Sequence, residues 1–478
     1  MNAPQLQRKL GLWACVSMVI GSVIGSSIFM KPATMAAQLG SPLLLLVVWV
    51  VAGIISIFGG MINAEIGAML PETGGQYTYF RYMYGRFFAY LFGWASFIVI
   101  NTAAIASIAF IFAQYTSFFI NLPSFSESIE RSFILTIPFI GKLFFLQNFG
   151  IKVVAILLIV VITFINYISL KAGSAIQVFF TALKIAALAF LIFSIFFSGK
   201  GSFNNFSIVS SDMDFSSISV LLGFVAATSG ALAAYDGWNN LGFVGGEIIN
   251  PKKNIPRGLI WGLISCIVLY VLTTQAYLYM LPIDEMKTSK MVATDALFKV
   301  MGVGGASVIA LLIIISTAGA TNGNILPTSR VTYAMAKDKV FFAAAGKVHK
   351  RFHTPYISLW LQCIWACLFV LSGSFDMLAD LFVFVTWIFY GFAAYGIIIL
   401  RRKMPLADRS YKLKGYPWIP IIFIFFALFY FILTIYNDVQ NYLSGKTEII
   451  FSALGLLLLA SGVPFYSYFN RTRSRKTT

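Results

Sequence analysis

The sequence predicts an all-α polytopic membrane protein with twelve transmembrane helices. Three observations support this fold class: the overall composition, a series of long apolar runs, and the placement of charges between those runs. Of 478 residues, 59% are hydrophobic and only 11% are charged. A soluble protein of this length carries about twice that fraction of charged residues, so a soluble fold is excluded.

The apolar runs set the number of helices. A helix needs roughly 20 apolar residues to cross about 30 Å of hydrocarbon. Such runs lie near residues 11–38, 42–70, 86–119, 149–168, 174–198, 218–246, 257–281, 303–332, 356–372, 378–400, 417–437 and 448–469. The length of the first run, together with the eleven runs after it, favours an uncleaved helix over a signal peptide.

The charges between the runs indicate the orientation in the membrane. With the N-terminus placed in the cytosol, 24 of the 34 Lys and Arg residues fall on the cytosolic side. Asp and Glu show the opposite split, with four cytosolic and eleven outside. This asymmetry follows the positive-inside rule, so we expect both termini in the cytosol of a plasma or bacterial inner membrane. The net charge of +17 therefore does not indicate nucleic acid binding. The basic tail Arg471, Arg473, Arg475 and Lys476 is expected to lie beside anionic lipid.

A single membrane transport domain is expected over residues 1–478. Its predicted parts are a cytosolic tail, two repeats of five helices, helices 11 and 12, and a basic cytosolic tail, over residues 1–10, 11–200, 218–401, 417–469 and 470–478. All four cysteines fall inside predicted spans, so neither a disulfide framework nor a metal site is expected. The sequence contains no cofactor-binding pattern and no paired catalytic constellation, so we do not expect an enzyme.

Two of the apolar runs are interrupted in mid-membrane. Gly25-Ser26-Ser27 interrupts the first, and Tyr235-Asp236-Gly237 interrupts the sixth. A broken helix exposes peptide groups that hydrocarbon cannot satisfy, so breaks occur against protein or a wet cavity. Spans 1 and 6 are the first helices of the two predicted repeats and enter from opposite sides. Paired breaks of this kind indicate an inverted repeat with a transported ligand between its halves.

The chemistry of the breaks fits a zwitterion. At the first break, the free amides of Ser26, Ser27 and Ile28 and the positive end of the restarting helix would bind a carboxylate. The carbonyls of Val23 and of residues 233–236 would accept hydrogen bonds from an ammonium group. The alternative is that the small residues only let membrane helices pack closely. The presence of breaks in both runs favours a binding site.

Several motifs resemble a known family in order along the chain. Residues 21–29, with the sequence GSVIGSSIF, are similar to the first-helix signature of the amino acid-polyamine-organocation (APC) superfamily. The second-to-third helix region is resembled by residues 70–79, with the sequence LPETGGQYTY. The sixth helix and exit loop of the L-type amino acid transporter branch are resembled by residues 235–239, YDGWN, and 250–257, NPKKNIPR. The branch also includes bacterial amino acid exchangers. Asn322-Gly323 with Ser329-Arg330, followed by Thr354-Pro355, resembles the eighth helix and the loop after it. The matches span about residues 10–360.

The resemblance implies a LeuT-like fold, a 5+5 inverted repeat with two additional C-terminal helices, that moves amino acids by alternating access. It places Ser26 and Ser27 at the substrate carboxylate, with Gly25 and Ile28 beside them. Val23, Ala233 and Asp236 would offer carbonyls to the amine, and Tyr235 and Asn239 would complete the pocket. Many members have Gly in place of Ser27, so the serine is expected to narrow the backbone approach to the carboxylate. L-type relatives carry a bulky aromatic gate in place of Ala233, so gating by that side chain is not expected here and the pocket is expected to be roomier.

Lys184 lies about ten residues into the fifth span. A cation at the bilayer centre costs about 2.5–3.5 kcal/mol on insertion scales, so it faces protein or water. With Gln177 and Thr181 it forms one polar helix face. In the APC superfamily, a lysine here resembles a fixed replacement for the sodium ion of sodium-coupled relatives. The usual hydroxyl partner in span 8 is replaced by Ala320, and we expect Ser316 to serve instead, with Thr317 and Thr321 as alternatives.

The predicted function is sodium-independent exchange of neutral amino acids. A cationic amino acid or amine antiporter, a proton-coupled permease and a sensor that binds without transport remain alternatives. Asp236 bears on the choice, because its carboxylate would either select cations or only cap the amides of the broken helix.

Eukaryotic members of the resembled branch join a glycoprotein through a cysteine in the loop between helices 3 and 4. Residues 120–148 contain no cysteine. We therefore expect no disulfide-linked ancillary subunit; the expected partners are the amino acid substrate and the lipid bilayer.

Overall fold

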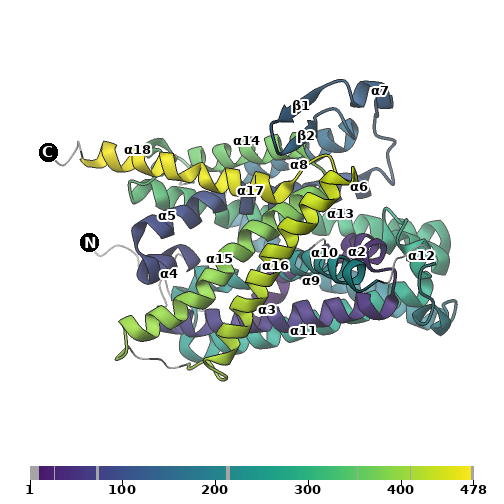
Figure 1. The fold of residues 1–478 in the computed structure, drawn as a ribbon, viewed down its shortest axis with the longest axis horizontal. Helices are drawn as coiled ribbons and strands as arrows, with labels where there is room; N and C mark the ends of the chain where they lie inside the picture. The colour runs from purple at the N-terminus through teal and green to yellow at the C-terminus, as the bar shows by residue number, and fades with distance from the viewer. Residues whose placement is uncertain are drawn as a thin grey trace.

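The computed structural model describes residues 10–25, 27–70, 75–168, 170–211, 216–352, 354–407, 409 and 411–474. Helices dominate this part of the chain (Figure 1). The first half contains α1 (Leu12–Val23), η1 (Ser27–Phe29), α2 (Lys31–Leu39), α3 (Pro42–Met69), α4 (Gly75–Tyr84), α5 (Arg86–Ala95), the π-helix η2 (Ser96–Ile100), α6 (Asn101–Thr116), α7 (Glu127–Glu130), β1 (Ile134–Ile137), β2 (Gly141–Phe144), α8 (Phe149–Ile168) and α9 (Leu170–Phe197).

The second half continues the helical pattern. It contains η3 (Phe203–Phe206), α10 (Ser217–Tyr235), the 3₁₀-helix η4 (Trp238–Glu247), α11 (Pro251–Met280), α12 (Ile283–Met286), α13 (Val292–Lys337), η5 (Ala343–Gly346), α14 (Tyr356–Ser372), α15 (Phe375–Lys403), α16 (Trp418–Leu443), α17 (Phe451–Ala460) and α18 (Gly462–Ser474). Helix α13 bends at Gly302, whose φ is 63°.

The helices have the length and composition of membrane spans. Nine described segments are long and apolar enough to cross a bilayer. Three shorter apolar helices, Leu12–Val23, Ala182–Phe197 and Tyr356–Ser372, fall in the predicted runs 11–38, 174–198 and 356–372. The prediction of an all-α membrane protein is therefore confirmed.

The predicted loop 120–148 contains more structure than its composition indicated. β1 and β2 pair antiparallel, from Ile134 opposite Phe144 to Ile137 opposite Gly141. The buried ammonium of Lys152 holds this hairpin, since it donates to the carbonyls of Phe144 at 2.7 Å and Leu371 at 2.8 Å. The hairpin, α7 and α12 lie at one end of the molecule, which we call the hairpin end; α4, α5 and the far end of α18 lie at the other (Figure 1).

Small residues allow the central helices to approach one another. Helix α11 packs along both α1 and α3. A Cβ added at Gly258 would lie 2.6 Å from Cys15 Cβ, and one at Gly262 would lie 2.6 Å from Val19 Cβ. Only glycine fits at these contacts, which is the usual way for membrane helices to pack without a hydrophobic driving force between them.

A buried ion cluster joins α3 to α15 at the end opposite the hairpin. Glu65 is 1% exposed and accepts two hydrogen bonds from the Arg401 guanidinium, at 2.9 and 2.7 Å. The Leu413 amide donates to the same carboxylate at 2.6 Å, and Arg409 lies 3.7 Å from it. The Arg401 guanidinium also lies over the Tyr416 ring. Glu65 therefore ties the chain after α15 to α3.

The first prediction concerns this cluster. Replacing Glu65 by Gln leaves two arginines without their counter-charge, and breaking a buried ion pair costs about 3 kcal/mol or more. We expect the thermal unfolding midpoint of Glu65→Gln in detergent to fall by several degrees. The matched control is Glu285→Gln, because Glu285 pairs with Lys299 but is 48% exposed and should contribute little. Equal midpoints for the two variants would contradict a stabilising role for the cluster.

Candidate functional site

The first predicted break is present. Helix α1 ends at Val23, Ile24 is extended with ψ 92°, and the chain resumes as η1 at Ser27. Within the described residues, the amides of Ser27 and Ile28 have no backbone acceptor, as the prediction of a carboxylate site requires. Ser26 lies outside the described residues. The Ile28 side chain is fully buried and does not contribute to the cavity described below.

The second predicted break lies directly against the first. Helix α10 ends at Tyr235, Asp236 is extended, and Gly237 has φ 111°. A side chain at Gly237 would be strained by this φ, and its Cβ would lie 2.6 Å from the Ser22 carbonyl oxygen. Glycine is therefore required both for the break and for its contact with α1.

Side chains from other helices satisfy the carbonyls that the breaks expose. The Tyr270 hydroxyl of α11 lies 2.8 Å from the Val23 carbonyl and 2.9 Å from the Ala234 carbonyl, so one group bridges the two breaks. The Tyr115 hydroxyl donates to the Phe29 carbonyl at 3.0 Å. The sequence analysis missed both tyrosines. The available signal was a tyrosine in mid-span, since a buried hydroxyl needs a partner.

A cavity of about 120 Å³ lies between the breaks. We call it the central cavity. Of the predicted site residues, Val23, Gly25, Ser27, Ala233, Asp236, Asn239 and Lys184 line it. Its other polar walls come from Asn101 and from residues that the prediction did not include: Ser22, Gln76, Ser96, Ser107, Asn240, Asn324, Thr328, Thr386 and Tyr390.

Besides Ile28, two predicted residues lie away from the central cavity. Tyr235 points into the helix packing, where its hydroxyl donates to the Trp49 carbonyl at 3.1 Å and its ring contacts those of Trp49 and Tyr270. Ser316 is also absent from the cavity wall, and its buried hydroxyl has no partner among the described residues. Ala320, one turn further along α13, lines the cavity instead.

Lys184 faces the central cavity from α9. Its side chain is 2% exposed, and its ammonium donates to the Gly21 carbonyl near the end of α1 at 3.3 Å. The predicted link from span 5 to the first break is therefore present. The predicted link to span 8 is not made: Thr317 and Thr321 donate to carbonyls of their own helix, and Ser316 does not contact the ammonium. The side chains of Gln177 and Thr181 lie outside the described part.

Asp236 receives a hydrogen bond that the sequence did not indicate. The Tyr390 hydroxyl of α15 donates to its Oδ1 at 2.6 Å. The Tyr390 contact adds a link from the second break to α15. Sequence spacing could not predict it, since the two residues are 154 positions apart.

Comparison with known proteins agrees with this geometry. A family model described as amino acid permease matches residues 10–459. The chain is 31% identical to the serine/threonine exchanger SteT of Bacillus subtilis (strain 168), over 96% of each chain. It is 29% identical to the human cystine/glutamate transporter, over 97% of this chain and 86% of that protein. It is 28% identical to the human large neutral amino acids transporter small subunit 2, over 96% and 80%.

These relatives are transporters and exchangers of amino acids, not enzymes, and they match nearly the whole chain. The family match and the apolar helices together make this an integral membrane protein. The chain belongs to the amino acid permease family of the APC superfamily, among the relatives of the L-type and bacterial amino acid exchangers.

Proposed function

We propose that this protein is a sodium-independent secondary transporter that exchanges small neutral amino acids by alternating access. The observation that carries the proposal is the pair of facing helix breaks around a cavity lined by polar groups. The amides of Ser27 and Ile28 suit the substrate carboxylate, and carbonyls at both breaks suit its ammonium group. Each carbonyl has two lone pairs, so Val23 can accept from a substrate as well as from Tyr270.

The charges on the cavity wall favour a substrate without net charge. Among the described wall residues, Lys184 and Asp236 are the only ionisable groups apart from the Tyr390 phenol, and they have opposite formal charges. A zwitterion can place its carboxylate on the side of Lys184 and its ammonium group on the side of Asp236. A cationic or anionic side chain would have to be buried without a counter-charge, which is costly.

The size and polarity of the cavity favour a small hydroxyl or amide side chain. At about 120 Å³, the cavity is smaller than the roughly 300–1,000 Å³ of pockets for drug-sized ligands. Uncharged hydrogen-bonding groups such as Asn101, Asn324 and Thr328 line much of it. The printed name of the bacterial relative, a serine/threonine exchanger, agrees with this class.

Lys184 supports the sodium-independent part of the proposal. A buried ammonium that links α9 to the end of α1 supplies a fixed positive charge where a coupling cation would otherwise be required.

The same proposal assigns the topology. Twelve crossings form a LeuT-like 5+5 inverted repeat over residues 11–200 and 218–401, followed by helices 11 and 12 over 417–469. The charge asymmetry supports cytosolic termini in a plasma or bacterial inner membrane. The hairpin end is then the outer side. The four cysteines are buried or half-buried in helices, so a disulfide-linked subunit is not part of the proposal.

Counterflow into proteoliposomes tests the function. Vesicles loaded with unlabelled serine should accumulate labelled serine at the same rate in sodium or choline buffer, because no sodium site is required. Empty vesicles are the control and should accumulate little. A panel of twenty unlabelled competitors identifies the substrate class. Binding without counterflow would indicate a sensor, and accumulation driven by an imposed sodium gradient would refute the sodium-independent mechanism.

A second prediction for this site concerns Lys184. Lys184→Met keeps most of the side-chain volume but removes the hydrogen bond to Gly21, and hydrogen bonds to charged groups contribute about 1.5–3 kcal/mol. We expect the initial counterflow rate to fall at least about tenfold. Lys200→Met is the matched control, because Lys200 is exposed in a loop. An unchanged rate in Lys184→Met would show that the cation is dispensable.

A third prediction separates the two roles of Asp236. In Asp236→Asn, the amide oxygen can still accept from Tyr390, so transport of neutral substrates should stay within about twofold of the unmodified protein. If the carboxylate selects cationic substrates instead, lysine and arginine should compete in the unmodified protein and lose that competition in the variant. The competition panel with both proteins decides between these outcomes.

A further inference from the structure

The two strands of the hairpin face different surroundings. A cavity of about 1260 Å³ lies at the hairpin end, and its wall includes residues 142–144 of β2 together with Gln147. Carboxylates of α15 and α16, among them Asp376 and Asp438, line the same cavity, so it is polar. None of residues 132–140, all of them described and including β1, belongs to this wall. The hairpin therefore turns β2 toward the polar cavity and β1 toward the outside of the molecule.

The outward side of the hairpin is apolar along its whole length. Residues 133–141 have the sequence FILTIPFIG and contain no charged side chain. Phe133 is 62% exposed, Phe139 at the turn is 97% exposed, and Ile134 and Leu135 are exposed on opposite faces of β1. Surfaces in water rarely expose a continuous apolar run of this kind, above all beside a free strand edge. This surface therefore calls for an apolar partner.

Backbone hydrogen bonds hold the hairpin in this orientation. The Lys142 amide donates to the Glu448 carbonyl at 2.8 Å, and the Ile450 amide donates to the Ile140 carbonyl at 2.8 Å. Residues 448–450, between α16 and α17, thus pair with β2 on the edge that β1 leaves free. Within the described part of the chain, β1 itself is paired along one edge only. The apolar side of β1 is therefore fixed facing outward.

This apolar surface continues the lipid-facing surface of two neighbouring helices. Leu157 and Val161 form an exposed apolar stripe on α8, and Ile364 and Leu368 form one on α14. Helix α8 begins five residues after β2 ends, and the Lys152 contact described above joins the hairpin to the last turn of α14. Figure 1 shows the hairpin beside these two helices, at the outer edge of the bundle. The bilayer that covers both stripes therefore extends to the hairpin.

The free edge of β1 determines the depth of this contact. In an antiparallel pair, alternate residues direct their N–H and C=O groups away from the partner strand. Hydrocarbon cannot satisfy these groups, so β1 does not lie in the core of the bilayer. Its apolar side chains, in turn, are stabilised by removal from water. The boundary between lipid headgroups and acyl chains meets both requirements, because it supplies hydrogen-bond partners next to an apolar layer.

We propose that residues 133–139 form an interfacial anchor, which inserts Phe133, Leu135 and Phe139 into the headgroup–acyl boundary of the leaflet at the hairpin end. Because residues 448–450 pair with the hairpin, the anchor also ties the connection between α16 and α17 to the bilayer. The inference goes beyond the proposed transport function and does not depend on it. It requires only that the chain is an integral membrane protein.

Nitroxide spin labels test the anchor in the full chain. The background has its four native cysteines replaced by alanine and is reconstituted into vesicles of phosphatidylcholine and phosphatidylglycerol in equal parts. Phe133→Cys and Phe139→Cys carry the label at the anchor. Leu157→Cys, on the exposed stripe of α8, is the control for lipid, and Gln147→Cys, on the polar cavity wall, is the control for water. Relaxation of each label is measured with oxygen, which enters lipid, and with a nickel chelate, which stays in water.

The ratio of oxygen to nickel accessibility at both anchor positions should be at least about threefold higher than at Gln147, because an interfacial apolar segment lies about 5–10 Å into the headgroup–acyl boundary. The ratio should stay below that of Leu157, which lies in a membrane-spanning helix. Adding Leu135→Asp to Phe139→Cys should lower the ratio, since a carboxylate resists transfer out of water. Leu135→Ile is the matched control and should leave the ratio unchanged.

A ratio at both anchor positions equal to that at Gln147 would overturn the proposal, because the hairpin would then lie in water. Low accessibility to both reagents would also overturn it and would indicate a protein partner on the free edge of β1, such as a second copy of the chain. Thermal unfolding midpoints equal to that of the background show that each labelled protein is folded. Absence of counterflow from the unmodified protein would refute the proposed transport function and leave the spin-label result unaffected.

Discussion

The site depends on one constraint: peptide groups exposed in the middle of a membrane must find partners inside the protein. Breaking α1 and α10 leaves carbonyls that hydrocarbon cannot satisfy. The structure supplies side-chain donors for them: Lys184 for Gly21, Tyr115 for Phe29, and the Tyr270 hydroxyl, which lies within hydrogen-bond distance of both Val23 and Ala234 and can donate to either. These donors come from α9, α11 and α6. The positions of the helices around the breaks are thus fixed by the need to pair the exposed carbonyls. The central cavity is the space that remains between them.

The same constraint explains which parts of the site the sequence could predict. A break shows locally, because Gly25 and Gly237 interrupt apolar runs and Lys184 is a charge where lipid excludes one. Each could be identified within its own helix. The nine described segments that are long and apolar enough to cross a bilayer could likewise be predicted, because span length follows from bilayer thickness.

The hydrogen-bond partners of these residues could not be predicted in the same way. The contact of Asp236 with Tyr390, and the bridging role of Tyr270, depend on how separate helices rotate and cross. The prediction that Ser316 pairs with Lys184 illustrates the limit. Both residues lie on helices that do pack together, yet it is Ala320 of α13, not Ser316, that shares the cavity with the ammonium. A shift of one turn along a helix changes which side chain faces a neighbour, and the sequence of one helix does not specify it.

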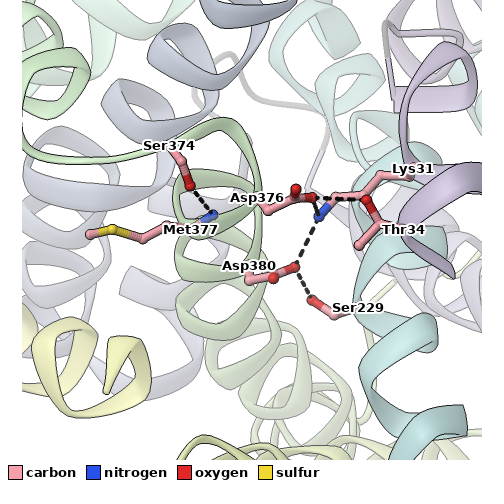
Figure 2. Close-up of polar contacts among 7 residues, drawn as sticks. All are labelled: Lys31, Thr34, Ser229, Ser374, Asp376, Met377 and Asp380. Carbon is pink, nitrogen blue, oxygen red and sulfur yellow. Dashed lines mark hydrogen bonds and ion pairs between the residues drawn. The ribbon is translucent and has the colours of Figure 1, made fainter. Parts of the chain in front are cut away.

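Charged contacts join helices at both ends of the molecule. At the hairpin end, Lys31 joins α2 to α15. At the other end, Asp338 after α13 accepts from Tyr77 at 2.9 Å, lies 3.9 Å from Arg81, and its carbonyl accepts from Arg86 at 2.5 Å. An apolar seal buries surface whose re-exposure costs free energy in proportion to its area. An exposed ion pair such as that of Arg81, which is 61% exposed, exchanges one set of polar partners for another and contributes little net free energy. Lys31, shown with its partners in Figure 2, is only 2% exposed, so loss of those partners would leave a buried charge and cost far more. The contact at the hairpin end therefore holds its helices together more strongly than the contact at the opposite end.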